Sequence, residues 1–350
     1  MVIAAHYAGP YVTHGPLETV IHQGSFAVTI FFVLSGFLIT HILLRDEITT
    51  GHISLRLFYL RRALRILPPL GFFLLGAAAL SKAGFFSIPG PDIFFSALFV
   101  RNYFGSSLSE TLHLWSLAIE EQFYLLWPLA LIATRTMVNR VVLCLVLIGF
   151  APIWRQINYH LAGGAANVSA FRTDIRYDPL IIGCLLAVLW SIPKLSGAFR
   201  SKRITNDWIA LGAVSVIAFF LLLTGFFKFR IMEASSLSVC SLCVAVIINC
   251  AVNNPVSVQG KILNNRVLRW VGRISYSLYL WQQLFIPPTP AVNPPWFKTF
   301  PMNLSLVFGL AMLSYYVVER PFVGLRRRLE PATKSIPNVG QFSTQANTQP

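Results

Sequence analysis

The sequence predicts an all-α protein, a polytopic membrane helix bundle of about ten transmembrane helices. Hydrophobic residues make up 55% of its 350 positions and charged residues only 12%, and the mean hydropathy is +0.63. This composition leaves too little polar surface to coat a soluble globule. The net charge is +15, but Lys and Arg stand in short blocks between apolar runs, whereas a nucleic-acid-binding protein gathers them on one solvated surface.

The N-terminal segment predicts an incomplete helix. The run MVIAAHYAGP contains His6 and is closed by Pro10, so it is far shorter than the roughly 20 residues that span hydrocarbon. We expect the first transmembrane helix to be truncated at its N-terminus, and a segment lying on the membrane surface is the alternative. The next run, FAVTIFFVLSGFLITHILL at residues 26–44, predicts a complete span in which Ser35 and Gly36 offer a neighbouring helix a close approach.

A basic segment follows this span. Its sequence, SLRLFYLRRALRILPP, predicts an amphipathic helix that ends at Pro68 and Pro69 and carries Arg61, Arg62 and Arg65 on one face. Guanidinium groups side by side suit phosphate groups. The general excess of basic residues on the cytoplasmic side of a membrane is the simpler explanation of any single arginine.

Apolar runs predict the remaining spans at about residues 70–83, 116–134, 141–156, 178–192, 207–227, 234–252, 274–288 and 301–318. Cytoplasmic loops collect Lys and Arg, and most of the 28 such residues fall inside when both termini are placed in the cytoplasm. Residues 1–328 are therefore expected to form one transmembrane domain. The Pro-, Ser- and Gln-rich residues 329–350 are expected to form a disordered cytoplasmic tail.

The five cysteines predict neither a disulfide framework nor a metal site. They are odd in number and lie within apolar runs. The pair Cys240 and Cys243 has CxxC spacing, but it falls in the middle of a predicted span, so we interpret both residues as small membrane-helix residues.

The stretch HLWSLAIEEQFYLLWP, residues 113–128, carries the two charges whose burial in a membrane costs the most free energy. Glu120 and Glu121 stand among aromatic and aliphatic residues, and a carboxylate inside a membrane needs a bundle interior or watered cavity and a partner. If the helix already includes His113, then His113, Glu120 and Tyr124 share one face, which could hold a polar ligand. The alternative is that the two carboxylates only clamp an arginine between helices.

Two other segments contain candidate site residues. His6 is expected near the outer end of the first helix, where a histidine can be the general base for a hydroxyl or a structural hydrogen-bonding group. In FRTDIRYDP the charged residues Arg172, Asp174, Arg176 and Asp178 alternate just before a span, which predicts four charges converging at the membrane mouth. They could bind sugar hydroxyls or form salt bridges with the glutamates of the central stretch.

Taken in order, these segments resemble the acyltransferase 3 family of integral membrane acyltransferases, which includes bacterial O-acetylases of surface polysaccharides. The resemblance covers nearly the whole chain and rests on the His6 segment, FFVLSGFLIT, RRALRILP, HLWSLAIEEQFYLLWP, FRTDIRYDPLIIGCLLA, ISYSLYLWQQ and VERPF. It implies a multi-pass protein of the bacterial inner membrane with no bound cofactor. It also implies acyl-CoA, usually acetyl-CoA, as the co-substrate from the cytoplasm, and a hydroxyl of a sugar or cell-envelope glycan as the acceptor.

The resemblance also implies roles for individual residues. The catalytic residues are expected to be His6, Glu120 and Glu121, and the donor-binding residues Arg61, Arg62 and Arg65. The acceptor-binding residues are expected among His113, Trp115, Ser116, Tyr124, Arg172, Asp174, Arg176 and Asp178. Two features depart from the family pattern: the usual arginine upstream of the first-helix histidine would precede residue 1, and the usual Trp-His pair of the ninth span reads Trp281-Gln282.

The function predicted on these grounds is transfer of an acyl group to a hydroxyl. A transporter of a lipid-linked or anionic sugar would also account for buried carboxylates and a basic cytoplasmic face. A scaffold subunit of an envelope-assembly complex would leave Glu120 and Glu121 unexplained. Consumption of a thioester by the purified protein separates these three functions.

Overall fold

The computed structural model describes residues 24–106, 109–161, 171–201, 206–226, 230–286 and 294–328 of the protein. Every regular element within those ranges is a helix, which confirms the all-α prediction. The predicted first helix with His6 and the predicted tail at residues 329–350 lie outside the described residues.

The α-helices in chain order are α3 (Gly24–Thr50), α4 (Leu55–Lys82), α5 (Gly90–Ala97), α6 (Trp115–Ala133), α7 (Met137–Leu161), α8 (Thr173–Arg176), α9 (Asp178–Ser191), α10 (Pro193–Arg200), α11 (Asp207–Phe226), α12 (Arg230–Asn253), α13 (Val258–Leu263), α14 (Arg266–Phe285), α15 (Met302–Leu313) and α16 (Arg320–Arg328). Short 3-10 turns occur at η2 (Leu112–Leu114) and η3 (Trp296–Lys298), and η4 (Ser314–Glu319) is a π-helical segment that joins α15 to α16.

Membrane-spanning helices make up much of this bundle. Five helices in the described part of the chain are long and apolar enough to cross a membrane, and a sixth is added if α9 and α10, which meet at 109°, count as one broken span. The predicted count of about ten spans is therefore not confirmed. The central helix α6 is shorter and carries two carboxylates, and α14 begins with a basic half.

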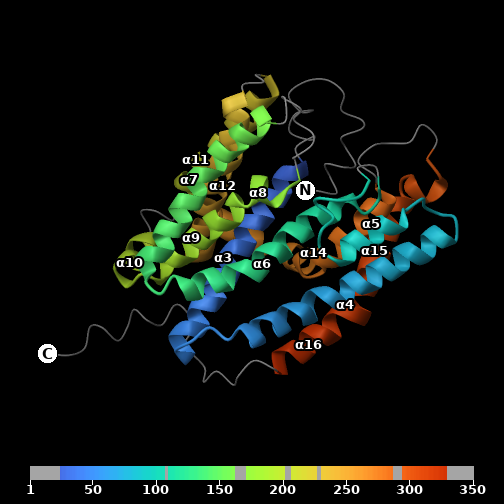
Figure 1. Ribbon diagram of the computed structural model, residues 1–350, viewed down its shortest axis with the longest axis horizontal. Coiled ribbons are helices and arrows are strands. Elements are labelled where there is room, and N and C mark those ends of the chain that lie inside the picture. Colours follow the sequence, from blue (N-terminus) through green and yellow to red (C-terminus); the bar gives the residue numbers. More distant parts are fainter. Residues whose placement is uncertain are drawn as a thin grey trace.

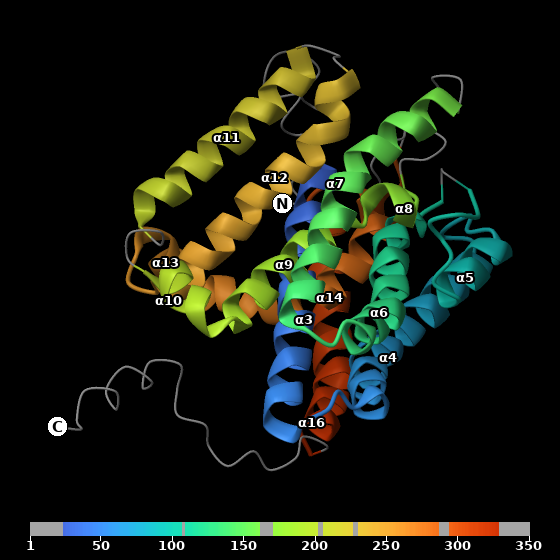
Figure 2. The same ribbon diagram turned by 60° about the vertical axis from the view of Figure 1, so that its left-hand side comes forward.

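The helices form two hydrophobic cores that share α3 and α9. The larger core joins residues of α3, α4, α6, α9, α14 and α15, and the smaller one lies between α3, α9, α11 and α12. Figure 1 shows α6 crossing the middle of the bundle above α4, and Figure 2 shows α11 on the outside, beside α12. The central position of α6 places its polar residues in the interior.

Two glycines let α3 and α9 cross in close contact. A Cβ atom at Gly36 would lie 1.9 Å from the Leu180 carbonyl oxygen, and one at Gly183 would lie 2.0 Å from the Val33 carbonyl oxygen. Only glycine permits this approach of two backbones. The prediction that Gly36 offers a close-approach surface is confirmed.

The prediction that the basic helix ends at Pro68 and Pro69 is wrong, because α4 continues through both prolines to Lys82. Proline usually breaks a helix by removing a hydrogen bond, but exposed backbone in hydrocarbon costs more, and neighbouring helices can compensate. The Tyr276 hydroxyl of α14 donates to the Ile66 carbonyl at 3.1 Å, which ties α14 to this part of α4.

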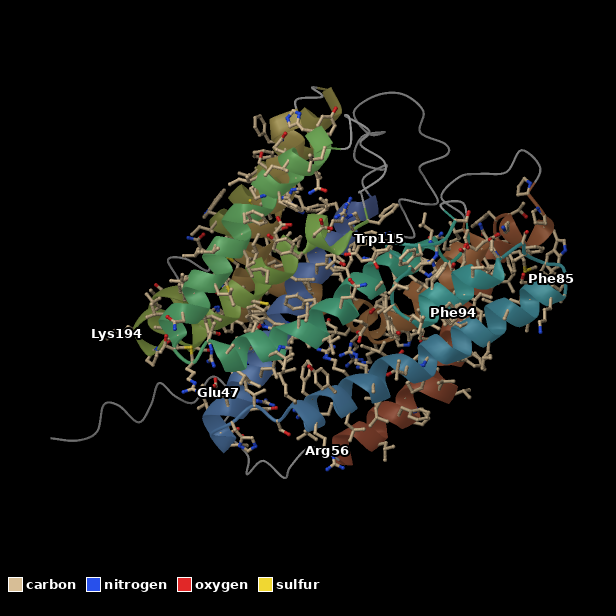
Figure 3. All side chains as sticks on the ribbon, in the orientation of Figure 1. Glu47, Arg56, Phe85, Phe94, Trp115 and Lys194 are labelled. Carbon is tan, nitrogen blue, oxygen red and sulfur yellow. The ribbon has the colours of Figure 1, made fainter. Side chains whose placement is uncertain are left out.

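The two ends of the bundle differ in character. Figure 3 shows Trp115, at the start of α6, far from Glu47 and Arg56, which lie where α3 and α4 meet. Near that junction the buried Arg140 donates to both Glu47 carboxylate oxygens, at 2.7 and 2.8 Å. This ion pair brings the α6–α7 junction to the same end as the α3–α4 junction.

Candidate functional site

The site is built around the first carboxylate of α6. Glu120 is only 4% exposed and accepts a hydrogen bond from the Tyr124 hydroxyl, one turn further along the helix. The Ser35 hydroxyl of α3 lies within hydrogen-bonding range of both side chains. The residue expected only to let helices approach thus also supplies a polar group to the buried carboxylate.

Two arginines of α4 surround this carboxylate, and the third does not. The Arg62 guanidinium lies 4.4 Å from the Tyr124 ring centroid and interacts electrostatically with Glu120 and Glu121. Arg65 interacts with Glu120 as well. Arg61 instead forms an ion pair with Asp46 at 2.6 Å, which fastens the α3–α4 turn. The three arginines that were expected to act together are therefore divided between two places.

A third carboxylate, from the end of the chain, joins this cluster. Glu319 is 5% exposed, accepts a hydrogen bond from the Ser277 hydroxyl at 3.0 Å and interacts electrostatically with Arg65. It closes the π-helical segment η4, and such irregular turns often occur at functional sites. The sequence contained a signal for it, the VERPF motif, but no role was assigned to that motif.

Two cavities lie on either side of the carboxylates. The first, which we call the α14 cavity, has a volume of about 260 Å³ and is lined by Glu120, Ser116, Tyr276, Tyr279 and apolar residues of α3. The second, the α4 cavity, has a volume of about 200 Å³ and is lined by Arg62, Glu121, Tyr124 and Tyr59, among others. Glu120 and Glu121 thus face different spaces, and a purely structural ion-pair clamp would not require either space.

His113 does not belong to α6, but its ring packs against Tyr279, a residue that lines the α14 cavity, with ring centroids 5.3 Å apart. His113 lies in the preceding 3-10 turn η2, so the condition under which it was predicted to share a helical face with Glu120, that the helix already includes His113, is not met. Its Nε2 is 3.1 Å from the Leu280 carbonyl oxygen, and the Tyr279 hydroxyl lies 2.5 Å from the His113 carbonyl and 2.6 Å from the Ser116 hydroxyl. These contacts join the start of α6 to α14.

The four charges expected at the membrane mouth do not converge on one point. Arg172 pairs with Asp174 at 2.7 Å. Asp178, which starts α9 and is fully buried, pairs with Arg155 at 2.8 Å and accepts from Ser238. The helix α8 is too short to align them, and the ion pairs recorded among the described residues do not join them to Glu120 or Glu121.

Arg176 alone of the four charged residues faces the central helix. Its guanidinium carbon lies 5.2 Å from the Trp115 ring centroid. Burial and, to a smaller extent, the nearby Arg155 lower the pKa of Arg176 to about 10, and Asp178 opposes the shift. Trp115 also packs against Phe171 with ring centroids 4.9 Å apart. An aromatic face beside a cation thus stands at the start of α6.

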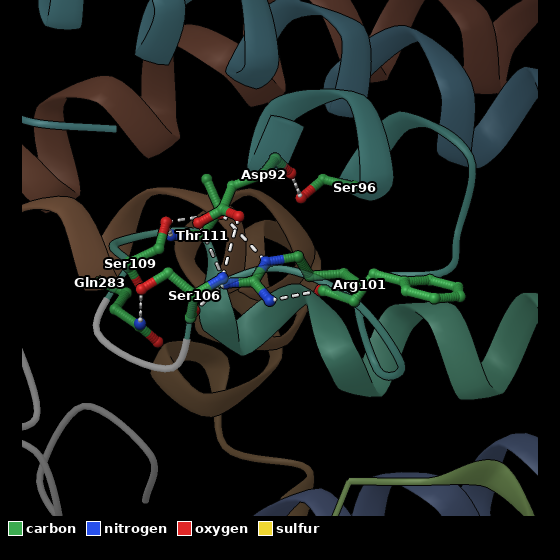
Figure 4. A network of polar contacts seen from close by, with 8 residues as sticks. Asp92, Ser96, Arg101, Ser106, Ser109, Thr111 and Gln283 are labelled. Carbon is green, nitrogen blue, oxygen red and sulfur yellow. Dashed lines mark hydrogen bonds and ion pairs between the residues drawn. The ribbon is translucent and has the colours of Figure 1, made fainter. Parts of the chain in front are cut away.

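The loop between α5 and α6 is held by a buried ion pair (Figure 4). Arg101 is 3% exposed, lies 3.4 Å from Asp92 and donates to the backbone carbonyls of Phe104 and Ser106. Burial lowers the pKa of Arg101, and Asp92 partly restores it. Because this loop leads directly into η2, the network fixes the position of His113.

Comparison with known proteins assigns the chain to a family. Residues 1–319 match the family model Acyl_transf_3, described as an acyltransferase domain. The chain belongs to the acyltransferase 3 family. No solved structure matches it.

Three curated relatives of this acyltransferase 3 chain come from bacteria. It is 31% identical over 327 residues to YrhL of Bacillus subtilis, covering 85% of this chain and 50% of YrhL. It is 30% identical over 324 residues to the peptidoglycan O-acetyltransferase OatA of Listeria monocytogenes, covering 85% of this chain and 51% of OatA. It is 30% identical over 346 residues to the O-acetyltransferase OatA of Staphylococcus aureus, covering 91% and 56%. The chain spans about half the length of these relatives.

The candidate site of this acyltransferase 3 chain places carboxylates, arginines and hydroxyl groups beside the α14 and α4 cavities. In the described residues no group of three or more His, Cys, Asp or Glu side chains could hold a metal ion. The carboxylates can accept a proton or orient a base, and the arginines can bind an anion. His6, the predicted general base, lies outside the described residues.

Proposed function

We propose that this chain is a membrane-embedded O-acyltransferase that moves an acetyl group from acetyl-CoA to a hydroxyl of a cell-envelope glycan. The observation that carries the proposal is the buried Glu120 carboxylate, which interacts with Arg62 and Arg65 and has a cavity on each side. Charged groups are kept inside a membrane protein mainly where function requires them. The printed names of the two OatA relatives support acetyl as the group and peptidoglycan as the class of acceptor.

The acyl donor, acetyl-CoA, is proposed to bind at α4. Arg62 borders the α4 cavity and Arg65 is exposed, so both could receive the phosphates of coenzyme A. Arg61 would join them by exchanging its partner Asp46 for a phosphate, at little cost because that pair is partly exposed. The pantetheine arm would then run between the helices toward Glu120.

The chemistry is proposed to be general-base acyl transfer. His6 takes the proton from the acceptor hydroxyl, whose oxygen forms a bond to the thioester carbon while the carbon–sulfur bond breaks. The leaving thiolate takes the proton back from His6 and departs as the thiol of coenzyme A. Glu120 or Glu121 orients the base. General-base help supplies a factor of about 10² to 10⁴, so positioning of the two substrates must supply much of the rest.

The acceptor is proposed to enter at the start of α6. Trp115 and Arg176 offer an aromatic face and a cation there, and Ser116 lies inside the α14 cavity. His113, Tyr124, Arg172, Asp174 and Asp178 remain proposed acceptor-binding residues, although Asp178 would first have to leave Arg155.

The first test measures thioester consumption. The purified chain in nanodiscs should release coenzyme A thiol from acetyl-CoA and transfer labelled acetyl to a soluble oligomer of N-acetylglucosamine. A transporter or a scaffold would consume no thioester. Absence of both thiol release and transfer in a folded sample would refute the proposed function.

Replacement of the proposed base is the second test. His6→Ala should abolish acetyl transfer, because no other group is proposed to take the hydroxyl proton, and should leave membrane insertion and abundance unchanged. His52→Ala is the matched control, because His52 is exposed in the turn between α3 and α4. Transfer assays and immunoblots measure both variants, and retained transfer in His6→Ala would remove His6 from the chemistry.

A further inference from the structure

Adjacent glutamines near the end of α14 have different surroundings. Gln283 is 3% exposed and its amide nitrogen donates to the Ser109 carbonyl at 3.2 Å. Gln282 is 1% exposed, yet its amide nitrogen has no hydrogen-bond partner among the described residues. A buried hydrogen-bond donor without an acceptor is destabilising. The Gln282 amide nitrogen would therefore be stabilised by an acceptor atom from a bound molecule.

The position of Gln282 on α14 relates it to the proposed reaction site. Ser275 and Tyr279 line the α14 cavity together with Glu120. Gln282 follows these two residues at i+7 and i+3, and therefore lies on the same face of the helix. Gln282 is not itself a lining residue, but it lies one turn beyond Tyr279 on the face of α14 that forms this cavity wall.

The direction of this wall follows from the contacts between α6 and α14. Tyr279 meets Ser116, and Gln283 meets Ser109, which precedes the start of α6. The two segments therefore run antiparallel. Gln282 lies one turn beyond Tyr279, away from Glu120 and toward the end at which α6 begins, which is the end where the acceptor is proposed to enter.

The polar groups along this wall have complementary hydrogen-bonding capacities. Glu120 offers carboxylate oxygens, which suit the hydrogen of a hydroxyl. The Tyr279 and Ser116 hydroxyls already contact each other and the His113 carbonyl. The Gln282 amide nitrogen can only donate, and sugars offer hydroxyl, ring and acetamido oxygens that accept.

We propose that the Gln282 amide donates a hydrogen bond to an oxygen of the bound sugar acceptor and so positions the acceptor beside Glu120. The inference rests on the proposed function and adds a specificity-determining residue to it. A sugar that lacks an oxygen at that place would leave the donor buried and unpaired, and would bind less tightly.

The two glutamines supply a matched pair of variants. Methionine has nearly the length of glutamine and no donor, so Gln282→Met should raise the acceptor KM about tenfold, the value of one lost hydrogen bond, and leave kcat nearly unchanged. Its melting temperature should not fall, because the Gln282 amide nitrogen makes no hydrogen bond within the part of the chain that the structure describes. Gln283→Met should lower the melting temperature, because the Ser109 carbonyl loses its donor, and leave the acceptor KM unchanged.

The assay uses the full chain in nanodiscs, acetyl-CoA at fixed concentration and an oligomer of N-acetylglucosamine at varied concentration. Hydrolysis of acetyl-CoA without acceptor should be equal in Gln282→Met and the unsubstituted chain. Gln282→His keeps an N–H donor of similar reach and should recover most of the acceptor affinity.

The outcomes separate this inference from the proposed function. An unchanged acceptor KM in Gln282→Met, with transfer intact in the unsubstituted chain, would overturn the role of Gln282 alone. A fall in melting temperature and in kcat like that of a structural variant would also overturn it. If the unsubstituted folded chain consumes no acetyl-CoA, the proposed function fails and this inference fails with it.

Discussion

At the scale of single residues, the charge of Glu120 is the feature on which the proposed chemistry depends. Glu120→Gln keeps an oxygen that can accept from Tyr124 but removes the negative charge that offsets Arg62 and Arg65. We expect it to lower kcat for acetyl transfer by about 10² to 10⁴. Transfer kinetics and thermal melting of the purified variant in nanodiscs measure the effect.

The control replaces another glutamate that holds an arginine. Glu47→Gln weakens the pair with Arg140 at the α3–α4 end of the bundle, far from Trp115 at the start of α6, so it should lower the melting temperature and spare the transfer rate. If Glu120→Gln and Glu47→Gln lost equal stability and both retained full transfer activity, Glu120 would only hold arginines in place and would take no part in the chemistry.

Residue types were easier to predict from the sequence than residue partners. The two glutamates stood out because charge is costly in an apolar run. Helical spacing placed Arg61, Arg62 and Arg65 on one face but could not reveal that Asp46 would hold the first of them. Glu319 stood in the quoted VERPF motif and Gln282 was noted as a departure from the family pattern, but neither was assigned a role, because their surroundings come from distant segments that only the fold brings together.

At the scale of elements, the crossing of α3 and α9 supports the Ser35 side of the site. Gly183→Ala would place a Cβ atom 2.0 Å from the Val33 carbonyl oxygen, so the two backbones must separate. We expect a loss of about 3 kcal/mol in stability, from the overpacking, and a lower transfer rate because Ser35 moves away from Glu120. Thermal melting in detergent and transfer assays check both effects.

A glycine with open space around it serves as the comparison. Gly149 lies within α7 and has no atom within 4 Å of a built Cβ, so Gly149→Ala should be neutral or stabilise the helix by up to about 1 kcal/mol. If Gly183→Ala melted at the same temperature as Gly149→Ala, the close crossing of α3 and α9 would not contribute to stability.

The elements themselves were largely predictable, and their exceptions have physical reasons. Hydrophobic runs gave α6 and α9 nearly to the residue, because burial of apolar side chains decides both. The prolines of α4 misled the prediction, because in hydrocarbon an unbroken helix costs less than an exposed backbone. The conformation of residues 172–178 could not be predicted, because alternating charges fit a helix or a strand equally well.

At the scale of the whole molecule, the proposal needs the two substrates to reach the cluster from opposite sides of the membrane. The 28 residues of α4 are about 42 Å long, enough to cross the roughly 30 Å of hydrocarbon. Basic residues gather at the end where α3 meets α4 and where Arg140 binds Glu47. The start of α6, with Trp115, lies at the other end. A donor from the cytoplasm therefore requires the α3–α4 end to face inward.

Thiol labelling of single positions tests this orientation. Thr50→Cys places a thiol at the exposed end of α3, and Tyr103→Cys places one in the loop before α6, where the side chain is 46% exposed. In intact bacterial cells a membrane-impermeant maleimide should label Tyr103→Cys and leave Thr50→Cys unlabelled, because basic ends stay in the cytoplasm. Both should react after permeabilisation. The unsubstituted chain gives the background, which should be low because its five cysteines are buried or half-buried. Labelling of Thr50→Cys in intact cells would place the arginines outside, where no acyl-CoA is available, and the proposed path of the donor would have to be abandoned.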